Sequence, residues 1–303
     1  MGSCSPIWVL AGALAAATGC NQVFGLEPPA EGDARLDATA GDGGAIDAPT
    51  ASWGEPTKIL VAASEAGFED DPHVSPDGLE LYFAYQLPPA PKELYRARRS
   101  RAGDGWQTAA PIVELNGALD SDASPHLTAD GRRLYFASNR PGGLGGDDIW
   151  AADRAGLADP WVLVGVDTGL STAAEDRHAS PCDGRARFVL ASNRPASVTS
   201  DLYEYDLEGT ARPLDELNSM ADDASPYLLE DCLTLYFSSN RVGTYDLYVA
   251  TRATPFDRWS TPRRLDELAT DAAEMDPWVS RDQRHLVYSV ASATGTDVVE
   301  SVR

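Results

Sequence analysis

Acidic side chains recur along this chain at nearly equal intervals, a pattern that first invites a catalytic interpretation. Each stands three residues before a common reference position, at Glu69, Asp122, Asp176, Asp223 and Glu274. Three copies also carry an arginine after an asparagine, at Arg140, Arg194 and Arg241. A catalytic group occurs once, in an asymmetric site, whereas a group repeated in every copy belongs to the scaffold. We therefore expect these acids and arginines to pair and to position loops.

The histidines offer little support for a metal site. His73 and His126 occupy the same position in adjacent copies, and two imidazoles that face each other could hold a metal. Packed or channel-lining imidazoles are the commoner use of such residues. His178 and His285 are interpreted as lying elsewhere in the repeat. Neither a Cys-x-x-Cys zinc motif nor a Gly-x-Ser-x-Gly nucleophile elbow occurs in the sequence. We expect no metal, no cofactor and no catalytic residue.

Two cysteines, Cys182 and Cys232, fall near the same turn of neighbouring copies. Export from the cytoplasm would permit a disulfide between them. A disulfide needs Cα atoms within about 7 Å, and equivalent points of neighbouring copies are farther apart unless one turn leans across. The sequence leaves the bond open.

All these residues belong to one sequence motif that the chain repeats. The reference positions are Pro72, Pro125, Ala179, Pro226 and Pro277, spaced by 53, 54, 47 and 51 residues. A run of the LYF type follows each of them, at 81–83, 134–136, 188–190, 235–237 and 286–288. A period in this range indicates a solenoid or a propeller.

Each copy predicts four short strands. The first follows the reference position, the second is the LYF run, and the third is an acid with two apolar residues, as in Asp148-Ile149-Trp150. The fourth is predicted at 110–115, 161–166, 211–217 and 261–268. No segment has a convincing 3.6-residue period, so we expect almost no helix. The pattern predicts an all-β fold, a β-propeller of four-stranded blades around a central channel.

The stretch LYFASNRPGGLGGDDIW at 134–150 carries a family resemblance. With the preceding D-x-x-P-x-x-S-type segment, it resembles the TolB-type, WD-like propeller repeat of bacterial envelope proteins. The resemblance is close in residues 122–150 and recognisable across residues 53–303. It implies the propeller fold rather than an activity, because propellers host both binding and catalysis.

The number of strands predicts five blades, whereas the family resemblance implies six as the alternative. An extra strand, TKILVA at 57–62, precedes the first copy, and the last copy stops after its third strand at 297–302. If these two segments pair, the N-terminal strand completes the last blade and no sheet edge is left exposed.

The first fifty-two residues predict export and tethering. An apolar run at 7–17 is too short to span a bilayer and suits a signal peptide. It leads to Ala17-Thr18-Gly19-Cys20, which resembles the lipobox of bacterial lipoproteins. The resemblance implies a signal peptide over 1–20 and acylation of Cys20; an ordinary secretory peptide is the alternative. Residues 21–52, rich in Gly, Ala and Asp, predict a disordered acidic linker. We therefore expect a lipid-anchored envelope protein that faces the periplasm or the cell surface.

Charge and loop pattern narrow the function. The formal charge of −23 repels nucleic acid and anionic headgroups, so we expect neither as a partner. We expect the protein to contact the membrane only through its lipid anchor, and to be a monomer. We expect a non-catalytic binding or scaffold module for an envelope protein, peptide or glycan. The alternative is a carboxylate-dependent glycoside hydrolase or lyase, which needs non-repeated acids at the channel mouth. We expect the non-repeated acids mainly in the linker and the fourth strands instead, which argues mildly against this alternative. Recognition is assigned to the loops that differ between copies, at Gln86, Leu87, Lys92, Thr294 and Thr296.

Acylation of Cys20 is directly testable. Mass spectrometry of the mature protein should find an acylated Cys20 as the first residue, and the protein should fractionate with membranes, because each buried methylene contributes roughly 0.8 kcal/mol. Cys20→Ser should abolish both. An unmodified residue other than Cys20 at the mature N-terminus would contradict the lipobox interpretation.

Overall fold

The structure is a computed structural model that describes residues 51–61, 67–182, 187–194 and 199–303. These residues belong to the compact unit Ala45–Arg303. The predicted signal peptide, Cys20 and nearly all of the predicted linker lie outside the described residues. Within the described ranges the chain forms twenty β-strands and no helix, hence none that is long and apolar enough to cross a membrane.

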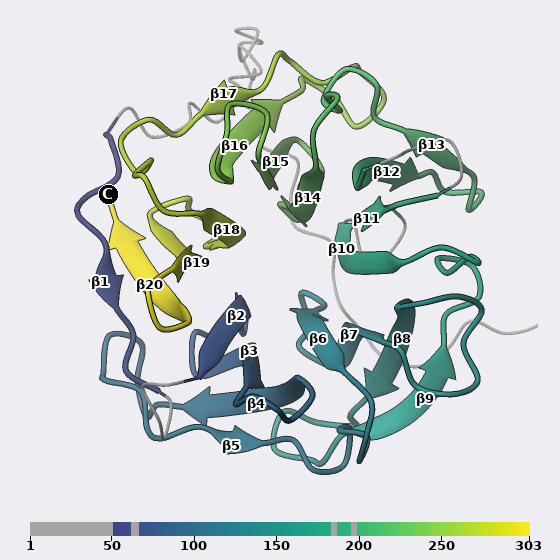
Figure 1. Cartoon of the computed structure of the whole chain (residues 1–303), viewed down its shortest axis with the longest axis vertical. Helices are drawn as coiled ribbons and strands as arrows, with labels where there is room; N and C mark the ends of the chain where they lie inside the picture. Colours follow the sequence, from purple (N-terminus) through teal and green to yellow (C-terminus); the bar gives the residue numbers. More distant parts are fainter. Residues whose placement is uncertain (1–50, 62–66, 183–186, 195–198) are drawn as a thin grey trace, which may run out of the picture. The chain divides into compact units, whose positions relative to one another are not determined.

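The strands form antiparallel groups of four around a common centre (Figure 1). One separate sheet contains β6 (Asp122–Leu127), β7 (Arg133–Ser138), β8 (Asp148–Asp153) and β9 (Val162–Val166). A second contains β10 (Asp176–Cys182), β11 (Arg187–Ser192), β12 (Asp201–Tyr205) and β13 (Ala211–Pro213). A third contains β14 (Asp223–Leu228), β15 (Thr234–Ser239), β16 (Asp246–Thr251) and β17 (Arg263–Arg264).

The remaining eight strands form one sheet made of two such groups. The first group is β2 (Phe68–Val74), β3 (Glu80–Gln86), β4 (Glu93–Arg98) and β5 (Ala110–Pro111). The second is β18 (Glu274–Val279), β19 (His285–Ala291), β20 (Thr296–Val302) and β1 (Thr57–Lys58). A single parallel pair, Phe68 with Thr296, joins them. The arrangement is that of a β-propeller. The number of blades stays a prediction, because two groups share a continuous sheet.

The innermost strand of each group begins earlier than predicted. Instead of following the reference position, β6, β10, β14 and β18 start at the repeated acid, and β2 starts one residue before it. Each of these strands pairs with its neighbour through a register shift just before the reference position. This shift is a β-bulge, in which an inserted residue interrupts the alternation of side chains. The interrupted alternation is why the sequence pattern placed the start of each strand too late.

The outermost strands are shorter than predicted in three of the four predicted places. Only two or three residues pair in β5, β13 and β17, and the chain then turns away. The turn buries two apolar side chains each time, as Ile112 and Leu115 do after β5. A short outer strand leaves little unpaired edge for association with another chain.

The N-terminal strand completes the last group, as predicted. Strand β1 is shorter than the predicted 57–62, but it pairs antiparallel with β20, Thr57 opposite Glu300 and Lys58 opposite Val299. The Gly54 amide also donates to the Val302 carbonyl over 3.0 Å. Trp53 is buried, and the Arg303 guanidinium lies 4.1 Å from its ring centre. The same Arg–Trp stacking recurs in other groups, for example Arg252 over Trp259 at 4.1 Å.

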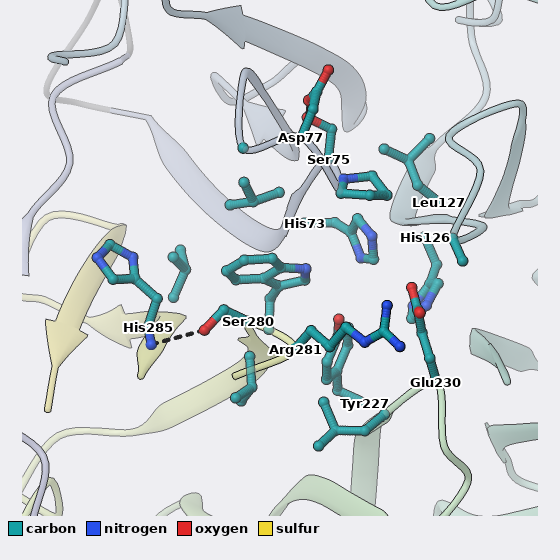
Figure 2. Close-up of a pocket in the computed structure, with 18 of the residues that line it drawn as sticks. His73, Ser75, Asp77, His126, Leu127, Tyr227, Glu230, Ser280, Arg281 and His285 are labelled. Atoms are coloured by element: carbon teal, nitrogen blue, oxygen red, sulfur yellow. Dashed lines mark hydrogen bonds between the residues drawn. The ribbon is translucent and has the colours of Figure 1, made fainter. Parts of the chain in front are cut away.

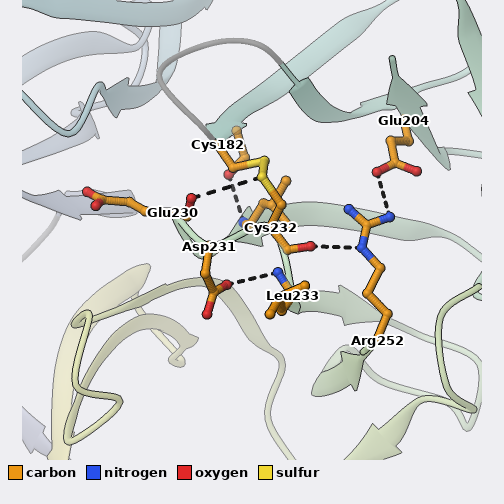
Figure 3. The surroundings of a disulfide bond; sticks show 9 residues. Cys182, Glu204, Glu230, Asp231, Cys232, Leu233 and Arg252 are labelled. Atoms are coloured by element: carbon orange, nitrogen blue, oxygen red, sulfur yellow. Dashed lines mark hydrogen bonds and ion pairs between the residues drawn. A yellow bond between two sulfur atoms is a disulfide. The ribbon is translucent and has the colours of Figure 1, made fainter. Parts of the chain in front are cut away.

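A disulfide joins Cys182 and Cys232, a bond that the sequence left open (Figure 3). The Cα atoms lie 5.5 Å apart. Cys182 ends β10, and Cys232 occupies the turn after β14 in the left-handed conformation that Gly78 and Gly131 adopt in other groups. The turn after β14 therefore leans across to the neighbouring sheet, and the bond clamps the two sheets beside the apolar cluster that contains Leu228 and Leu235.

Closure by the N-terminal segment predicts a large stability effect at Trp53. Trp53→Ala should lower the free energy of unfolding by about 3–5 kcal/mol, because it removes a buried indole from the closing group. Leu60→Ala is the control: it lies in the same segment, but its side chain is 72% exposed, so little change is expected. Urea unfolding followed by tryptophan fluorescence and circular dichroism measures both, and equal stabilities would contradict the closure.

Candidate binding site in the central channel

The bulges of the five innermost strands bring five non-repeated side chains together. We call Asp71, Ser124, His178, Ser225 and Asp276 the channel ring. Each stands one residue before a reference position and has a φ between 49° and 56°. This left-handed conformation is uncommon for residues other than glycine, and bulges often serve to re-aim a side chain. Its recurrence in all five strands therefore indicates a feature of the fold rather than a local accident.

Hydrogen bonds connect the whole channel ring. The Ser124 amide donates to Asp71 Oδ2 over 2.9 Å, and His178 Nε2 lies 2.8 Å from Asp71 Oδ1. The Ser225 hydroxyl donates to Asp276 Oδ1 over 2.6 Å and also lies 3.4 Å from His178 Nε2. The Asp71 amide donates to Asp276 Oδ2 over 3.3 Å. Two aspartates and a histidine thus share one small polar centre.

A second acid and a lysine adjoin the channel ring. The Lys92 ammonium lies 2.5 Å from Asp70 Oδ2. Burial and the neighbouring Asp71 carboxylate raise the pKa of Asp70 to about 7, against the opposing effect of Lys92. Burial favours neutral Asp71, but His178 outweighs it and holds the pKa of Asp71 well below its usual range. Perturbed carboxyl groups of this kind gather at functional sites.

The Asp71 carboxylate acts on two other members of the channel ring, His178 and Asp276. Burial lowers the pKa of His178, but Asp71 reverses this and raises it above its usual value. Burial and the Asp71 carboxylate together raise the pKa of Asp276. One carboxylate and one imidazole therefore act as a charged pair, while Asp276 resists ionisation beside them. The small cavity lined by the channel ring, about 30 Å³, can take a water molecule or an ion but no sugar ring.

A larger cavity of about 690 Å³ lies on the other side of an aromatic floor. His73, His126 and Tyr227 border both cavities, so they separate the channel ring from this larger space. The rings of His73 and His126 lie 4.3 Å apart, and Trp278 packs beside them. Burial and His178 lower the pKa of His126 to about 3, so it is neutral and suited to packing. The paired histidines thus form a floor between the two cavities.

The turns between the first and second strands line this space, which we call the turn-face cavity. Asp77 and Asp282 are used within their own turns, since each accepts a backbone N–H two residues later. Glu230, Arg281 and Arg284 are exposed at the rim, and none of them forms a salt bridge with another described residue. In Figure 2 the labelled side chains of Arg281 and Glu230 extend towards each other in the view.

The repeated acids and arginines lie away from the channel ring, near the loops after the second strands. Arg140 Nη2 lies 2.5 Å from Asp122 Oδ1, Arg194 Nη2 lies 3.0 Å from Asp176 Oδ1, and Arg241 pairs with Asp223. The three carboxyl groups are fully buried. Each arginine also donates to a carbonyl before the first strand, at Leu115, Leu170 and Leu217. These contacts connect two loops of the same group.

The two end groups have no arginine at this place. The Thr270 hydroxyl donates to the buried Glu274, which therefore binds its own preceding loop instead. Glu69 is likewise buried in β2. Neither acid adjoins the channel ring, so the acids found by their repetition differ from the acids that meet in the channel.

The loops predicted to bind a ligand fall into different environments. Leu87 and Thr294 are exposed, and Gln86 donates to the Ala90 carbonyl within its own loop. Lys92 reaches the neighbourhood of the channel ring through Asp70. Thr296 was wrongly placed in a loop: it is buried at the start of β20, opposite Ala291. None of these five residues lines the turn-face cavity.

Sequence reasoning missed the channel ring itself. The expectation that non-repeated acids lie mainly in the linker and the fourth strands is wrong for Asp71 and Asp276. His178 does lie at another position of the repeat than His73 and His126, as predicted, but that position is the one that Asp71 and Asp276 occupy in their strands. The available signal was a position that reads Asp, Ser, His, Ser and Asp immediately before five nearly identical reference positions.

Comparison with known proteins identifies the fold alone. No protein-family model and no curated protein matches the sequence. A putative TolB from Agrobacterium tumefaciens is 17% identical over 75% of this chain and 71% of that chain, with a TM-score of 0.47. A family 117 glycoside hydrolase produced by Zobellia galactanivorans is 14% identical, covering 83% and 90%, with a TM-score of 0.53. An α-L-arabinofuranosidase from Podospora anserina, solved with cellotriose, is 12% identical, covering 83% and 96%, with a TM-score of 0.56.

The buried pair of Arg140 and Asp122 predicts a stability loss that a surface pair does not. Arg140→Ala should lower the free energy of unfolding by about 3–5 kcal/mol, because Asp122 would remain buried without its cation. Arg133→Ala is the control: Arg133 pairs with Asp153 over 2.6 Å in the same group, but both side chains are partly exposed. That variant should lose about 1 kcal/mol or less. Urea unfolding that ranks the two equally would refute the structural role.

Proposed function

We propose that this chain is a non-catalytic binding module of the bacterial envelope, and that the turn-face cavity receives a short peptide segment of a partner protein. The cavity itself carries the proposal. Its volume of about 690 Å³ falls in the range of about 300–1,000 Å³ that is typical of ligand sites. It opens among the described turns that follow the innermost strands, at one end of the channel, where a ligand can enter.

The distribution of side chains favours a peptide. The floor is built from the aromatic and imidazole rings of His73, His126, Tyr227 and Trp278, while charges of both signs stand at the rim. An apolar centre within a polar, charged rim is the usual anatomy of a protein-binding surface. Arg281, Arg284 and Glu230 could form salt bridges with the charged side chains of a peptide that has an apolar anchor, whereas a neutral glycan could offer them hydrogen bonds alone.

The hydrolase alternative has weaker support. A glycosidase needs two carboxyl groups on either side of a sugar bond. Asp71 and Asp276 are non-repeated acids in one place, but only a cavity of about 30 Å³ adjoins them. In the turn-face cavity, Asp77 and Asp282 are occupied by backbone amides of their own turns. The two solved hydrolases above resemble this chain in fold, which does not carry an activity.

The cellular setting is part of the proposal. The residues around Cys20 support export and lipid anchoring, and the repeat supports membership of the TolB-type propellers. A lipid anchor followed by a long acidic linker would hold the binding module clear of the membrane, within reach of envelope proteins.

Site-specific photo-crosslinking tests the binding face. A benzophenone amino acid at Arg281 should capture a peptide from envelope extract, whereas the same probe at the exposed Leu87 on the loop 86–92 should not. Arg281→Glu should then weaken binding of the identified peptide about tenfold or more at an unchanged melting temperature, because it reverses a rim charge. Rewriting residues 86–92 should leave the affinity unchanged.

Three outcomes would overturn the proposal. Capture from Leu87 alone would move the site to the opposite face. Specific retention on a glycan array that Arg281→Glu abolishes would replace the peptide with a sugar. Turnover of aryl glycosides that is lost in Asp71→Asn would establish the hydrolase alternative.

A further inference from the structure

We propose that the channel ring binds one divalent metal ion through Asp71, His178 and Asp276, with Zn²⁺ as the best candidate. These side chains come from β2, β10 and β18, three strands separated by large intervals of sequence. The site lies on the far side of the aromatic floor from the turn-face cavity, so it is separate from the proposed peptide site.

The donor atoms have the spacing of a coordination sphere. One atom from each of the three side chains lies within 4.8 Å of the others. His178 Nε2 lies 2.8 Å from Asp71 Oδ1 and 3.7 Å from Asp276 Oδ1. Donors that are each about 2.0–2.2 Å from a zinc ion are separated by roughly 3–3.5 Å, so small shifts would place all three around one ion.

A cavity adjoins these donors. The channel ring lines a space of about 30 Å³, and its wall includes all three proposed ligands. A single water or ion needs about 10–15 Å³, so the space can hold the ion with a water as an additional ligand. This space is independent of the side-chain spacing, since three close donors could equally have packed without a void.

The charge balance also favours a cation. Three carboxyl groups meet here, from Asp70, Asp71 and Asp276, and the only permanent cation among the described residues that contacts them is Lys92. Asp70 Oδ1 is buried and has no hydrogen-bond partner among the described residues. Buried carboxylates are costly unless they are paired or coordinate a metal. A divalent ion would offset this charge, and its binding would release to solvent the proton that lies between His178 Nε2 and Asp71.

The surrounding hydrogen bonds orient the ligands. The Ser225 hydroxyl donates to Asp276 Oδ1, and the Ser124 amide donates to Asp71 Oδ2, which leaves Asp71 Oδ1 directed at His178. Such outer contacts fix ligand geometry in metal sites. One imidazole with two carboxylates suits Zn²⁺ or Mn²⁺ better than Mg²⁺ or Ca²⁺, which prefer oxygen ligands alone.

Calorimetric titration of the chelator-treated full chain with Zn²⁺, Mn²⁺, Ca²⁺ and Mg²⁺ tests the site. We expect one saturable Zn²⁺ site per chain, and a rise in melting temperature on adding Zn²⁺. His178→Gln and Asp276→Asn should each weaken the site about tenfold or more and abolish the thermal shift. His285→Gln is the control, because His285 lies outside the channel ring and is also a partly exposed imidazole.

Two variants of the channel ring are used so that the test still stands if one of them misfolds. Circular dichroism shows whether each variant is folded. The proposal is overturned if none of the four metals binds saturably, or if Zn²⁺ binding persists in both variants, as it would if the ion were held elsewhere in the chain. A crystal soaked in Zn²⁺ should show anomalous density about 2.0–2.2 Å from His178 Nε2.

Discussion

The bulge in every innermost strand is the constraint on which the centre of this propeller depends. A regular strand would send alternate side chains to the two faces of its blade and leave the channel lined by backbone. The extra residue, held at positive φ, turns one side chain per blade towards the axis. Because five such residues meet, the channel acquires a polar centre that any single blade lacks. Two residues after the ring residue, four of these strands carry a side chain of the aromatic floor: His73, His126, Tyr227 and Trp278.

Charge is distributed in this molecule according to burial. The chain has a net charge of −23, and several of its buried carboxylates are each matched by an arginine. Asp122 has Arg140, and Glu204 has Arg252, whose guanidinium is fully buried 2.8 Å away. The second pair joins neighbouring groups, so it reinforces the same boundary as the Cys182–Cys232 bond. The channel ring departs from this matching, which is why it stands out as a site.

Repetition made much of this fold predictable and hid its most individual feature. The LYF runs, the near absence of helix and the closing strand could be predicted, because a propeller repeats one pattern of pairing and burial. An alignment of the copies emphasises the positions whose residue type is shared. Asp71 and His178 occupy a fixed position of the repeat, but the residue type there differs between copies, so the repeat pattern does not single them out. The disulfide depends on how far one turn leans, and the length of each outer strand depends on tertiary packing. Neither is encoded in local periodicity.

The closing strand β1 also determines how the whole propeller responds to mechanical load. Tension applied through the residues before Ala51 first reaches Trp53 and β1, since the described chain enters the ring there. The contacts that carry this tension are the Trp53–Arg303 stack and the pairs between β1 and β20, which are the same contacts that close the ring. Forced unfolding follows the barrier to unfolding rather than the equilibrium stability. A propeller pulled from its N-terminal side would therefore yield by opening at this seam, because the disulfide joins β10 to the turn after β14 and leaves the pairing of β1 with β20 without a covalent link.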